Sequence, residues 1–462
     1  MKDVVIVGAG LAGLSAAWRL RHWDVQLLEA NHRVGGRVRS EKRGQYWLNW
    51  GGHMYAGAGS STAELFGETG TASIKIPGVL AGMSLNGKTL SSGPIQTYPL
   101  RFPMPLKSRL QVFTKGAKIS KDLVRYARVV ATRPGETGAV RQQRIYDFEN
   151  DRTFADYVGA LEEDTAAFFL PTVTRSSADF DQISAGAGIG YFSLIWNIGA
   201  GLDRYILGGP STLTETIAET LRDRIELEAE VHEVVQNSDH VVVRYRRGDE
   251  EFEIKARTAV LATPAPITHR IAVNLRPELR EALSKIVYGP LVSGAFLTNE
   301  TTPQAWDHVY GTAAGKKSFV VALNSGNIVR GRETVRQPGG SMMTFSAANQ
   351  ARELLDLPNE EVVERYTRDL DAIYPGFADY IVEAEVAKFP LGSPYCFPGR
   401  GKLQPELTRP SERVFLAGDY LGTLYTETSI TSGFTAAQEA ASLLATQMQR
   451  GDGSVKDHLL RG

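Results

Sequence analysis

Three glycines near the N-terminus form a GxGxxG pattern: Gly8, Gly10 and Gly13. They follow an apolar, β-branched run at residues 4–7, which predicts a buried parallel strand, and they precede a helical pattern at residues 14–20. In such a unit the first glycine permits the tight turn, the second lets a pyrophosphate approach the backbone, and the third lets helix and strand pack closely. The pattern therefore predicts a Rossmann-type α/β unit whose helix N-terminus faces the phosphates of a dinucleotide.

An acidic residue lies where such a unit needs one. The second predicted strand, residues 25–28, ends at Glu29. A carboxylate at this position accepts a hydrogen bond from a ribose hydroxyl, and an acid instead of an arginine favours an unphosphorylated ribose, as in FAD or NAD. The alternative is a glycine-rich turn in an α/β protein that binds no nucleotide. The presence of the strand, the helix and the acid together disfavours it.

Later segments predict more elements of an α/β domain. A capping-box pattern at residues 212–215, Thr-Leu-Thr-Glu, predicts the start of a helix, and a last helix is expected at about residues 432–448. The expected strands share apolar, β-branched patterns and lie at residues 225–235, 241–245, 252–256, 259–262 and 414–418. Residues 80–200 are helical in pattern, and residues 286–400 mix strands with a helix. One α/β domain is therefore assembled from three pieces, with a second domain inserted twice.

Composition excludes several classes of protein. The 462 residues include 51 basic and 52 acidic ones, and the formal charge of -1 provides no field that would steer the chain to nucleic acid. The single cysteine, Cys396, excludes an internal disulfide, and the eight histidines include no HExxH pattern, so no metal site is predicted. No stretch has the ~18 apolar residues of a membrane-spanning helix, and the first apolar run is too short for a secretory signal. We therefore expect a cytoplasmic protein.

The segment 101–144 departs from this neutrality, with 11 Lys or Arg against 2 acids. A contact with an anionic membrane surface is one explanation of such a segment, and a solvated helix face is the favoured one. We therefore expect no membrane partner.

Six blocks of the sequence together resemble the flavin-containing amine oxidase superfamily, which includes monoamine and polyamine oxidases and protoporphyrinogen oxidase. The blocks are VVIVGAGLAGLSAAWRL (4–20), LLEANHRVGGRVRS (27–40), NWGGHM (49–54), GGPSTLTETIAETL (208–221), AVLATPAP (259–266) and VFLAGDY with YTETSITSGFTAAQEAA (414–420 and 425–441). With the order of the predicted elements, the resemblance implies a Rossmann-type FAD-binding domain at residues 1–80, 201–285 and 395–462. A substrate-binding domain of mixed sheet and helices is interleaved with it, at residues 81–200 and 286–394.

The resemblance also implies which residues contact FAD besides the glycine loop and Glu29. The implied contacts to the pyrophosphate, the isoalloxazine ring, the adenine side and the ribitol are Gly36, Arg37, Gly51, Gly52, His53, Met54, Val231, Gly418, Asp419, Thr428, Ser429 and Ile430. The last three are expected to precede the final helix, whose N-terminal dipole would stabilise an anionic reduced flavin. In covalent members the linking cysteine aligns at or near Gly392, and Cys396 falls about four residues later. Non-covalent FAD is therefore expected, with Cys396 a bystander.

On the substrate side, the resemblance places Tyr425 at one wall of an aromatic cage beside the flavin. Tyr395 is the candidate for the second wall, and His53 is the candidate for a general base. The alternative for Tyr425 is a core tyrosine near the last helix, and the alternative for Tyr395 is a packing residue in a loop. The alternative for His53 is a histidine that only hydrogen-bonds to backbone. Tyr191, Phe192 and Trp196 are further candidates to line the cavity, although packing in the core is favoured for them.

The function implied is oxidation of an amine to an imine, with a hydride passing from the carbon of the C–N bond to flavin N5 and O2 as acceptor, giving H2O2. Many amine oxidases place a lysine near N5, but this chain has no lysine between Lys285 and Lys316, and the candidate positions are Gly294 and Ala295. A protoporphyrinogen oxidase-like ring dehydrogenation or a flavin-dependent isomerisation therefore stays an alternative, as does a flavin-binding protein without turnover. The expected partners are a small-molecule substrate and O2, and the sequence predicts no oligomeric state.

Overall fold

The computed structural model describes residues 1–78, 82–195, 201–423 and 425–459. Its first large sheet has the strand order β10-β2-β1-β13-β12-β11, with β19 paired to β13. The strands are β1 (Lys2–Val7), β2 (Val25–Leu28), β10 (Ile225–Glu226), β11 (Glu230–Gln236), β12 (Val241–Arg247), β13 (Glu250–Leu261) and β19 (Val414–Leu416). β1 lies between β2 and β13 in parallel pairing, and Val4, Val5 and Ile6 are fully buried. This confirms the predicted Rossmann-type unit.

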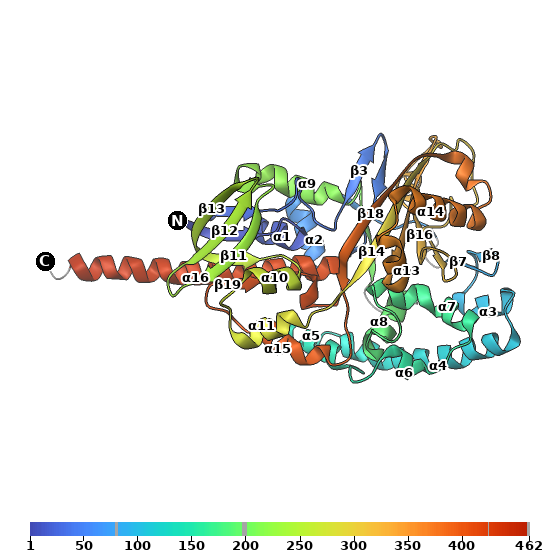
Figure 1. Ribbon diagram of the computed structural model, residues 1–462, viewed down its shortest axis with the longest axis horizontal. Helices are drawn as coiled ribbons and strands as arrows, with labels where there is room; N and C mark the ends of the chain where they lie inside the picture. The colour runs from blue at the N-terminus through green and yellow to red at the C-terminus, as the bar shows by residue number, and fades with distance from the viewer. Residues whose placement is uncertain (79–81, 196–200, 424, 460–462) are drawn as a thin grey trace.

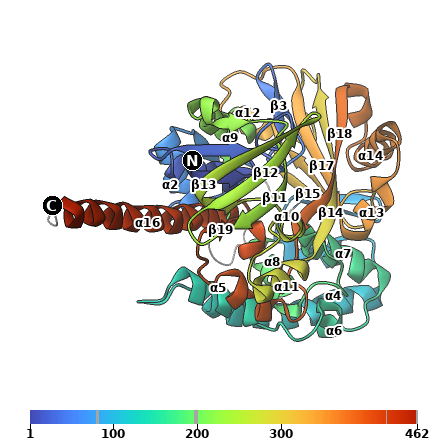
Figure 2. The ribbon, with the colours of Figure 1, turned by 60° about the vertical axis from the view of Figure 1, so that its left-hand side comes forward.

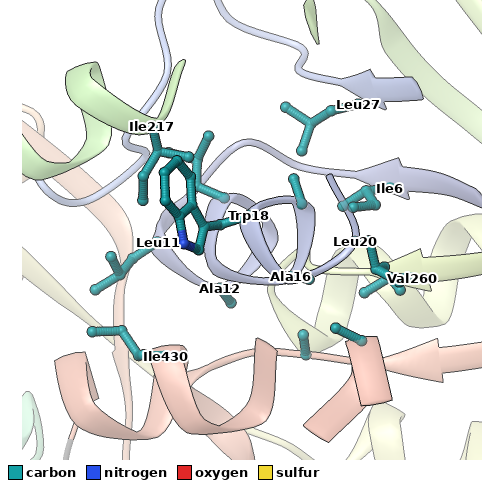
Figure 3. Packing of buried hydrophobic residues seen from close by; sticks show 14 of the residues in the cluster. Ile6, Leu11, Ala12, Ala16, Trp18, Leu20, Leu27, Ile217, Val260 and Ile430 are labelled. Carbon is teal, nitrogen blue, oxygen red and sulfur yellow. The ribbon is translucent and has the colours of Figure 1, made fainter. Parts of the chain in front are cut away.

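The helix α1 (Leu11–Arg19) packs between this sheet and the last helix, α16 (Tyr425–Leu459). Its small residues, such as Ala12 and Ala16, allow the close approach, and Figure 3 shows Leu11 beside Ile430 of α16. Glycine is required on both sides of α1. A Cβ atom at Gly13 would lie 1.9 Å from the Gly8 carbonyl oxygen, and one at Gly433 would lie 2.4 Å from the Ala12 carbonyl oxygen.

The strand β13 corrects one sequence prediction. A separate strand was expected at residues 259–262, but β13 is continuous over Glu250–Leu261. Its first half pairs antiparallel with β12 across a tight turn at Gly248, whose φ is 59°. Its second half pairs parallel with β1 and with β19. The separate strand was wrong because the partner changes from β12 to β19 while the backbone stays extended.

Two helices begin earlier than the sequence patterns predicted. The prediction of a capping box at residues 212–215 is wrong. The helix α9 (Ser211–Thr220) has Pro210 at its N-cap and no side-chain cap. Gly208 and Gly209, with φ of 86° and 102°, turn the chain directly into the helix, so Thr212 is already helical.

The last helix, α16, begins at Tyr425 and not near residue 432. Residues 428–430 therefore lie inside its first two turns and do not precede it. The polar, β-branched start of α16 has modest helix propensity, but Ile430 is fully buried against α1 and Glu427 accepts hydrogen bonds from the Ser61 and Thr62 N–H groups of α2 (Ser61–Thr69). Tertiary packing overrides local propensity here.

A second large sheet has the order β18-β14-β17-β16-β15-β7-β8. Its strands are β7 (Gly82–Leu85), β8 (Lys88–Leu90), β14 (Tyr288–Thr298), β15 (Gly311–Ala314), β16 (Val321–Asn324), β17 (Gly340–Ala347) and β18 (Ile381–Pro394). Five of these strands come from residues 288–394 and two from residues 82–90. Two small sheets join β3 (Ser40–Arg43) with β4 (Tyr46–Asn49), and β9 (Leu202–Ile206) with β5 (Tyr55–Ala56) and β6 (Ser73–Lys75).

The first sheet lies at the left of Figure 1, the second lies at the right, and a layer of helices from residues 106–195 lies below. This helical layer consists of α4 (Leu106–Val130), α5 (Gly138–Asp147), α6 (Phe154–Val158), α7 (Glu163–Val173) and α8 (Ala185–Ile195). Figure 2, in which the molecule is turned by 60°, shows the same layer and the end of α16 projecting from the body. The other helices are α3 (Tyr98–Arg101), α10 (Ala265–Ile271), α11 (Pro277–Ser284), α12 (Gly326–Arg330), α13 (Ala348–Leu355), α14 (Asn359–Ile373) and α15 (Gln404–Leu407).

The basic segment 101–144 coincides largely with α4 and α5, and acids around it form ion pairs with several of its cations. Lys107 pairs with Glu162 at 2.7 Å, and Arg125 pairs with both Asp122 and Glu149. In the described part of the chain, no helix is long and apolar enough to cross a membrane.

Replacement of Gly13 by alanine should destabilise the protein by about 3 kcal/mol, because the new Cβ would overlap backbone atoms that cannot move cheaply. Gly10→Ala is the matched control: a Cβ there meets nothing within 4 Å, and the φ of -71° suits alanine. Thermal unfolding of the two cofactor-free variants should show a lowered midpoint for Gly13→Ala only. An unchanged midpoint for Gly13→Ala would contradict the tight contact with Gly8.

Candidate active site

The glycine loop between β1 and α1 offers bare backbone and open space. No atom lies within 4 Å of the position that a Cβ at Gly10 would take. Gly36 approaches from the other side, where an added Cβ would lie 3.3 Å from the Gly10 Cα. The Gly35 N–H donates to the Ala9 carbonyl at 2.8 Å. Because α1 has no side-chain cap, the N–H groups of its first turn remain available. This cradle fits the phosphates of a dinucleotide.

Glu29 is 6 % exposed at the end of β2. Its Oε2 accepts from the Ala9 N–H at 2.7 Å, and its Oε1 accepts from the backbone and side chain of Asn31. These bonds fix the carboxylate beside the glycine loop. The strand β11, which contains Val231, begins next to Glu29, because the Ala229 N–H donates to the Glu29 carbonyl at 2.8 Å. The structure thus brings Glu29 and Val231 to the loop.

Arg37 and Asp419, predicted as separate cofactor contacts, are bonded to each other. The two Nη atoms of Arg37 donate to the two carboxylate oxygens of Asp419 at 2.7 and 3.1 Å, and Nη1 also donates to the Gly392 carbonyl at 3.0 Å. Burial alone lowers the pKa of Arg37, but the charge of Asp419 and the hydroxyl of Tyr288 outweigh it and raise that pKa. The bidentate pair therefore joins two segments that are far apart in sequence.

Tyr288 was missed by sequence reasoning. Its hydroxyl donates to Asp419 at 3.3 Å, and the Arg37 guanidinium lies over its ring, 5.6 Å from the centroid. Burial raises the pKa of Tyr288 well above its ordinary value, so it stays a donor. No sequence pattern indicated this role, because Tyr288 begins a strand in the weakly resembling part of the chain.

Gly418 and the start of α16 are joined through Ser432. The Gly418 N–H donates to Ser432 Oγ at 2.9 Å, and that hydroxyl donates back to the Gly418 carbonyl at 3.2 Å. Thr428, Ser429 and Ile430 lie in the first two turns of α16, so the expectation that they precede this helix is wrong. Ile430 is fully buried, which makes it a packing residue of the α1–α16 contact.

The Gly51–Gly52 segment lies between Arg37 and α16. The Gly52 N–H donates to the Arg37 carbonyl at 2.9 Å, and a Cβ at Gly51 would lie 2.1 Å from that oxygen. Thr426 of α16 donates from Oγ1 to the Met54 carbonyl at 2.8 Å. The segment predicted to face the isoalloxazine ring therefore lies beside the start of α16.

His53 is 8 % exposed. Its Nδ1 lies 2.8 Å from the Gly51 carbonyl, which can only accept, so Nδ1 carries the proton and Nε2 carries a lone pair. In the described residues Nε2 has no hydrogen-bond partner. Burial, with the charge of Arg175, lowers the pKa of His53 to about 4, although the bond to Gly51 acts in the opposite direction. At neutral pH His53 is therefore an uncharged acceptor, and a pKa this far below 7 makes it a weak base, which disfavours the predicted role as a general base.

A cavity of about 440 Å³ lies between the helical layer and the start of α16. Both tyrosines predicted as cage walls, Tyr425 and Tyr395, line it, whereas His53 does not. Tyr191 of α8 also lines it, with its ring centroid 6.3 Å from that of Tyr425. Phe192 points into the core instead, and Trp196 lies outside the described residues. Tyr191 and Tyr425 therefore form the closest aromatic pair that the structure describes at this cavity.

Tyr425 itself has unusual geometry. Its φ is 32°, a left-handed conformation that is costly for a bulky residue and that clusters at functional sites. Its hydroxyl is buried without a hydrogen-bond partner in the described residues, and burial raises its pKa. An apolar, aromatic wall with one unsatisfied hydroxyl is suited to a small polar ligand.

Cys396 also lines the cavity, but its thiol is engaged. Its Sγ accepts from Asn150 and from Ser184, each at 3.4 Å. Burial raises the pKa of the thiol, so the reactive thiolate is disfavoured. Among the described residues, no group of three His, Cys, Asp or Glu side chains is arranged to hold a metal ion.

The neutral state of His53 has a consequence for stability. Its folded pKa of about 4 lies below the unfolded value of about 6.5. Between these values the unfolded chain binds a proton that the folded chain does not, so stability falls as the pH is lowered from 6.5 to 4, by up to about 3 kcal/mol. Denaturation of the protein and of His53→Gln at several pH values should show a weaker dependence in the variant. His232→Gln, at an exposed histidine, serves as control, and equal slopes for all three proteins would refute the assignment.

The chain is similar to known proteins over almost its whole length. The family model for flavin containing amine oxidoreductases matches residues 11–442. L-amino acid oxidase Cdc18 of Crotalus durissus cumanensis is 24 % identical, over 95 % of this chain and 90 % of that protein, and flavin-containing amine oxidase of Oncorhynchus mykiss is 24 % identical, over 95 % and 85 %.

Solved structures of amine oxidases share the fold. Wild-type putrescine oxidase bound to putrescine has a TM-score of 0.73 at 18 % identity, with 96 % of this chain and 99 % of that chain covered. Cyclohexylamine oxidase from Brevibacterium oxydans IH-35A has a TM-score of 0.74 at 18 % identity, with 97 % and 99 % covered. The glycine cradle, the aromatic cavity and the match over residues 11–442 agree, and the chain belongs to the flavin containing amine oxidoreductase family.

Proposed function

We propose that this flavin oxidoreductase binds FAD without a covalent bond and oxidises a small amine to an imine, with O2 as final acceptor and H2O2 as product. The observation on which the proposal depends most is the aromatic pair Tyr191–Tyr425, which lines a cavity at the first turn of α16. The same turn contacts the Gly52–Met54 segment through Thr426. The cavity and the Gly52–Met54 segment therefore both adjoin the first turn of α16.

The residues of the first sheet are suited to hold the cofactor. The open space at Gly10 and the uncapped start of α1 suit the pyrophosphate, and the fixed carboxylate of Glu29 suits a ribose hydroxyl. Arg37 is held by Asp419 and is one-third exposed, which leaves donor capacity for a phosphate. The proposed FAD-binding domain is 1–80, 201–285 and 395–462, and all strands of the first sheet come from these segments.

The residues around the cavity have a different task, which is to bind and orient the amine. When bound, FAD supplies the hydride acceptor. Tyr191, Tyr425 and Tyr395 provide apolar walls that exclude water and favour an uncharged amine, because a cation loses hydration there. The proposed substrate-binding domain is 81–200 and 286–394, which supplies Tyr191 and the strands of the second sheet. The cytoplasmic location stays a prediction.

A second candidate is ring dehydrogenation or isomerisation. It is favoured by the absence of a lysine on β14, where Gly294 is enclosed: a Cβ at this position would lie 2.6 Å from the Tyr366 ring. An isomerase returns the hydride and consumes no oxygen. Incubation with amines, polyamines and a porphyrinogen, with peroxide and oxygen measured, separates the candidates. Peroxide from an amine supports amine oxidation, whereas anaerobic conversion without peroxide would overturn it in favour of isomerisation.

The purified protein should be yellow, and acid precipitation should release FAD, identified by chromatography. Gly10→Ala should lower flavin occupancy several-fold although its fold is intact, because the Cβ fills the space proposed for the phosphates. Glu29→Ala should also weaken retention, by about 1.5–3 kcal/mol for a lost charged hydrogen bond. Flavin that remains on the denatured protein would refute the non-covalent mode. Full occupancy in both variants would refute the proposed cradle.

Tyr425→Phe should change turnover more than flavin binding, since the ring stays and only the unsatisfied hydroxyl is removed. We expect kcat to fall about three- to tenfold, with the flavin spectrum and the unfolding midpoint close to those of the wild type. Tyr146→Phe is the matched control, because the Tyr146 hydroxyl donates to the Gly422 carbonyl and has a structural role. Loss of folded protein on Tyr425→Phe would instead identify a core tyrosine.

A further inference from the structure

The helix α4 carries an exposed apolar stripe. Its members Leu106, Leu110, Phe113 and Val124 are 71, 57, 40 and 56 % exposed. Spacings of four, three and eleven residues return to the same side of an α-helix, so these side chains lie within about 60° of one another around the helix axis. Single exposed apolar side chains are common on protein surfaces, whereas a contiguous apolar patch marks a contact with another molecule.

The packing of the helical layer does not use the apolar stripe. The buried apolar residues of α4 are Val112, Ile119 and Leu123, which belong to the core of this layer. They lie about 120° away from the stripe around the helix axis. The helix thus has two apolar faces, and the described residues bury only one of them. The layer itself forms the bottom of the molecule in Figures 1 and 2.

Cations accompany the apolar stripe. The helix α4 contains seven Lys or Arg residues and one acid, Asp122, which is buried and accepts from Arg125 at 2.8 Å. Lys121 and Arg128 are exposed on the side of the stripe, three and four residues from Val124. Neither forms an ion pair with any residue that the structure describes. Their charges are therefore available to an anionic partner.

The net charge of the molecule is unevenly distributed. Residues 101–144 hold 11 Lys or Arg and 2 acids, which is a formal charge of +9. Because the whole chain carries -1, all other residues together carry -10. An anionic surface therefore attracts the segment that contains α4 and repels the rest of the chain, which orients the molecule with α4 toward that surface.

We propose that α4 binds flat on an anionic lipid membrane, with the apolar stripe inserted below the headgroups. Leu106, Leu110 and Phe113 leave water there, and their burial favours binding. Lys121 and Arg128 lie at the level of the anionic headgroups, which their long apolar stems allow them to reach. The helix lies on the bilayer in this arrangement and does not cross it.

A second copy of the chain could also cover an apolar stripe, but charge disfavours it. In a two-fold interface the same surface patch faces itself. Lys121 and Arg128 of one copy would then lie near the cations of the other, and like charges brought together weaken such a contact. The only acid of α4, Asp122, is buried and bonded, so it offers no compensation. An anionic membrane supplies the negative charge that a second copy lacks.

Sedimentation of the purified chain with lipid vesicles tests the proposal. The wild type should bind vesicles of phosphatidylglycerol and phosphatidylcholine about tenfold more tightly than vesicles of phosphatidylcholine alone, and salt should weaken this binding. The triple variant Leu106→Ser/Leu110→Ser/Phe113→Ser should bind about 100-fold more weakly, because the inserted area is lost. Lys121→Gln/Arg128→Gln should bind about 25-fold more weakly, at about fivefold for each cation.

Matched controls change exposed residues of other elements. Val335→Ser/Val382→Ser removes two exposed apolar side chains, and Arg222→Gln/Lys255→Gln removes two exposed cations. Both controls should bind the anionic vesicles as the wild type does. Absence of vesicle binding by the wild type would overturn the proposal. Binding that the triple variant retains in full and only the loss of cations weakens would also overturn it, because the surface would then be a general site for polyanions.

Light scattering without lipid separates a membrane from a second copy of the chain. The wild type and the triple variant should have the same molar mass and the same unfolding midpoint, because the replaced side chains are exposed and pack against nothing in the core. Leu110→Ser alone, with an expected loss of about fivefold in vesicle binding, repeats the test with one change. A dimer that dissociates in the triple variant would assign the apolar stripe to a second copy and overturn the proposal.

Discussion

The close approach of three backbone segments at Gly13 and Gly433 determines where the rest of the site can be. At Gly13, α1 lies against the loop that ends β1, and at Gly433, α16 lies against the backbone of α1. Neither contact has room for a methyl group, so the distance between the glycine loop and α16 is fixed. The first turn of α16 contains Tyr425, and thus the cavity wall is positioned by packing at the opposite end of the chain.

Polar contacts hold the loop after β19 and the start of α16 at points that backbone packing alone would not fix. The Arg37–Asp419 pair joins the loop after β2 to the loop after β19, and Ser432 ties Gly418 to α16. Glu427 holds the start of α2. Each of these bonds involves the loop after β19 or the start of α16, and two of the three reach back to residues near the N-terminus. The contacts around the glycine loop and the start of α16 are therefore assembled from both ends of the chain, whereas most residues that line the cavity come from residues 126–194.

Sequence reasoning succeeded where short-range patterns are sufficient. The Gly8–Gly13 loop, β1, β2 and Glu29 follow from residue spacing, because strand, turn and helix are adjacent in the chain.

Sequence reasoning failed where the structure depends on distant partners. β13 is continuous because β19 replaces β12 at its side, and α16 begins at Tyr425 because Ile430 and Glu427 find partners in α1 and α2. Neither partner can be inferred from local propensity. The side of the site toward the proposed substrate was predicted least, for a related reason. Tyr425 and Tyr395 were identified by resemblance and do line one cavity, but Tyr288, which bonds Asp419 at 3.3 Å, has no local pattern at all.

The burial of the proposed substrate site also bears on the protonation state of the amine. Hydride loss from carbon requires a neutral nitrogen, and an ammonium group loses its hydration when it enters a medium of low dielectric constant. Among the described residues that line the cavity there is no Asp or Glu, so no carboxylate there would stabilise a cation. Tyr191, Tyr395 and Tyr425 form apolar walls of the same cavity. These walls can therefore favour the uncharged state in which an amine reacts.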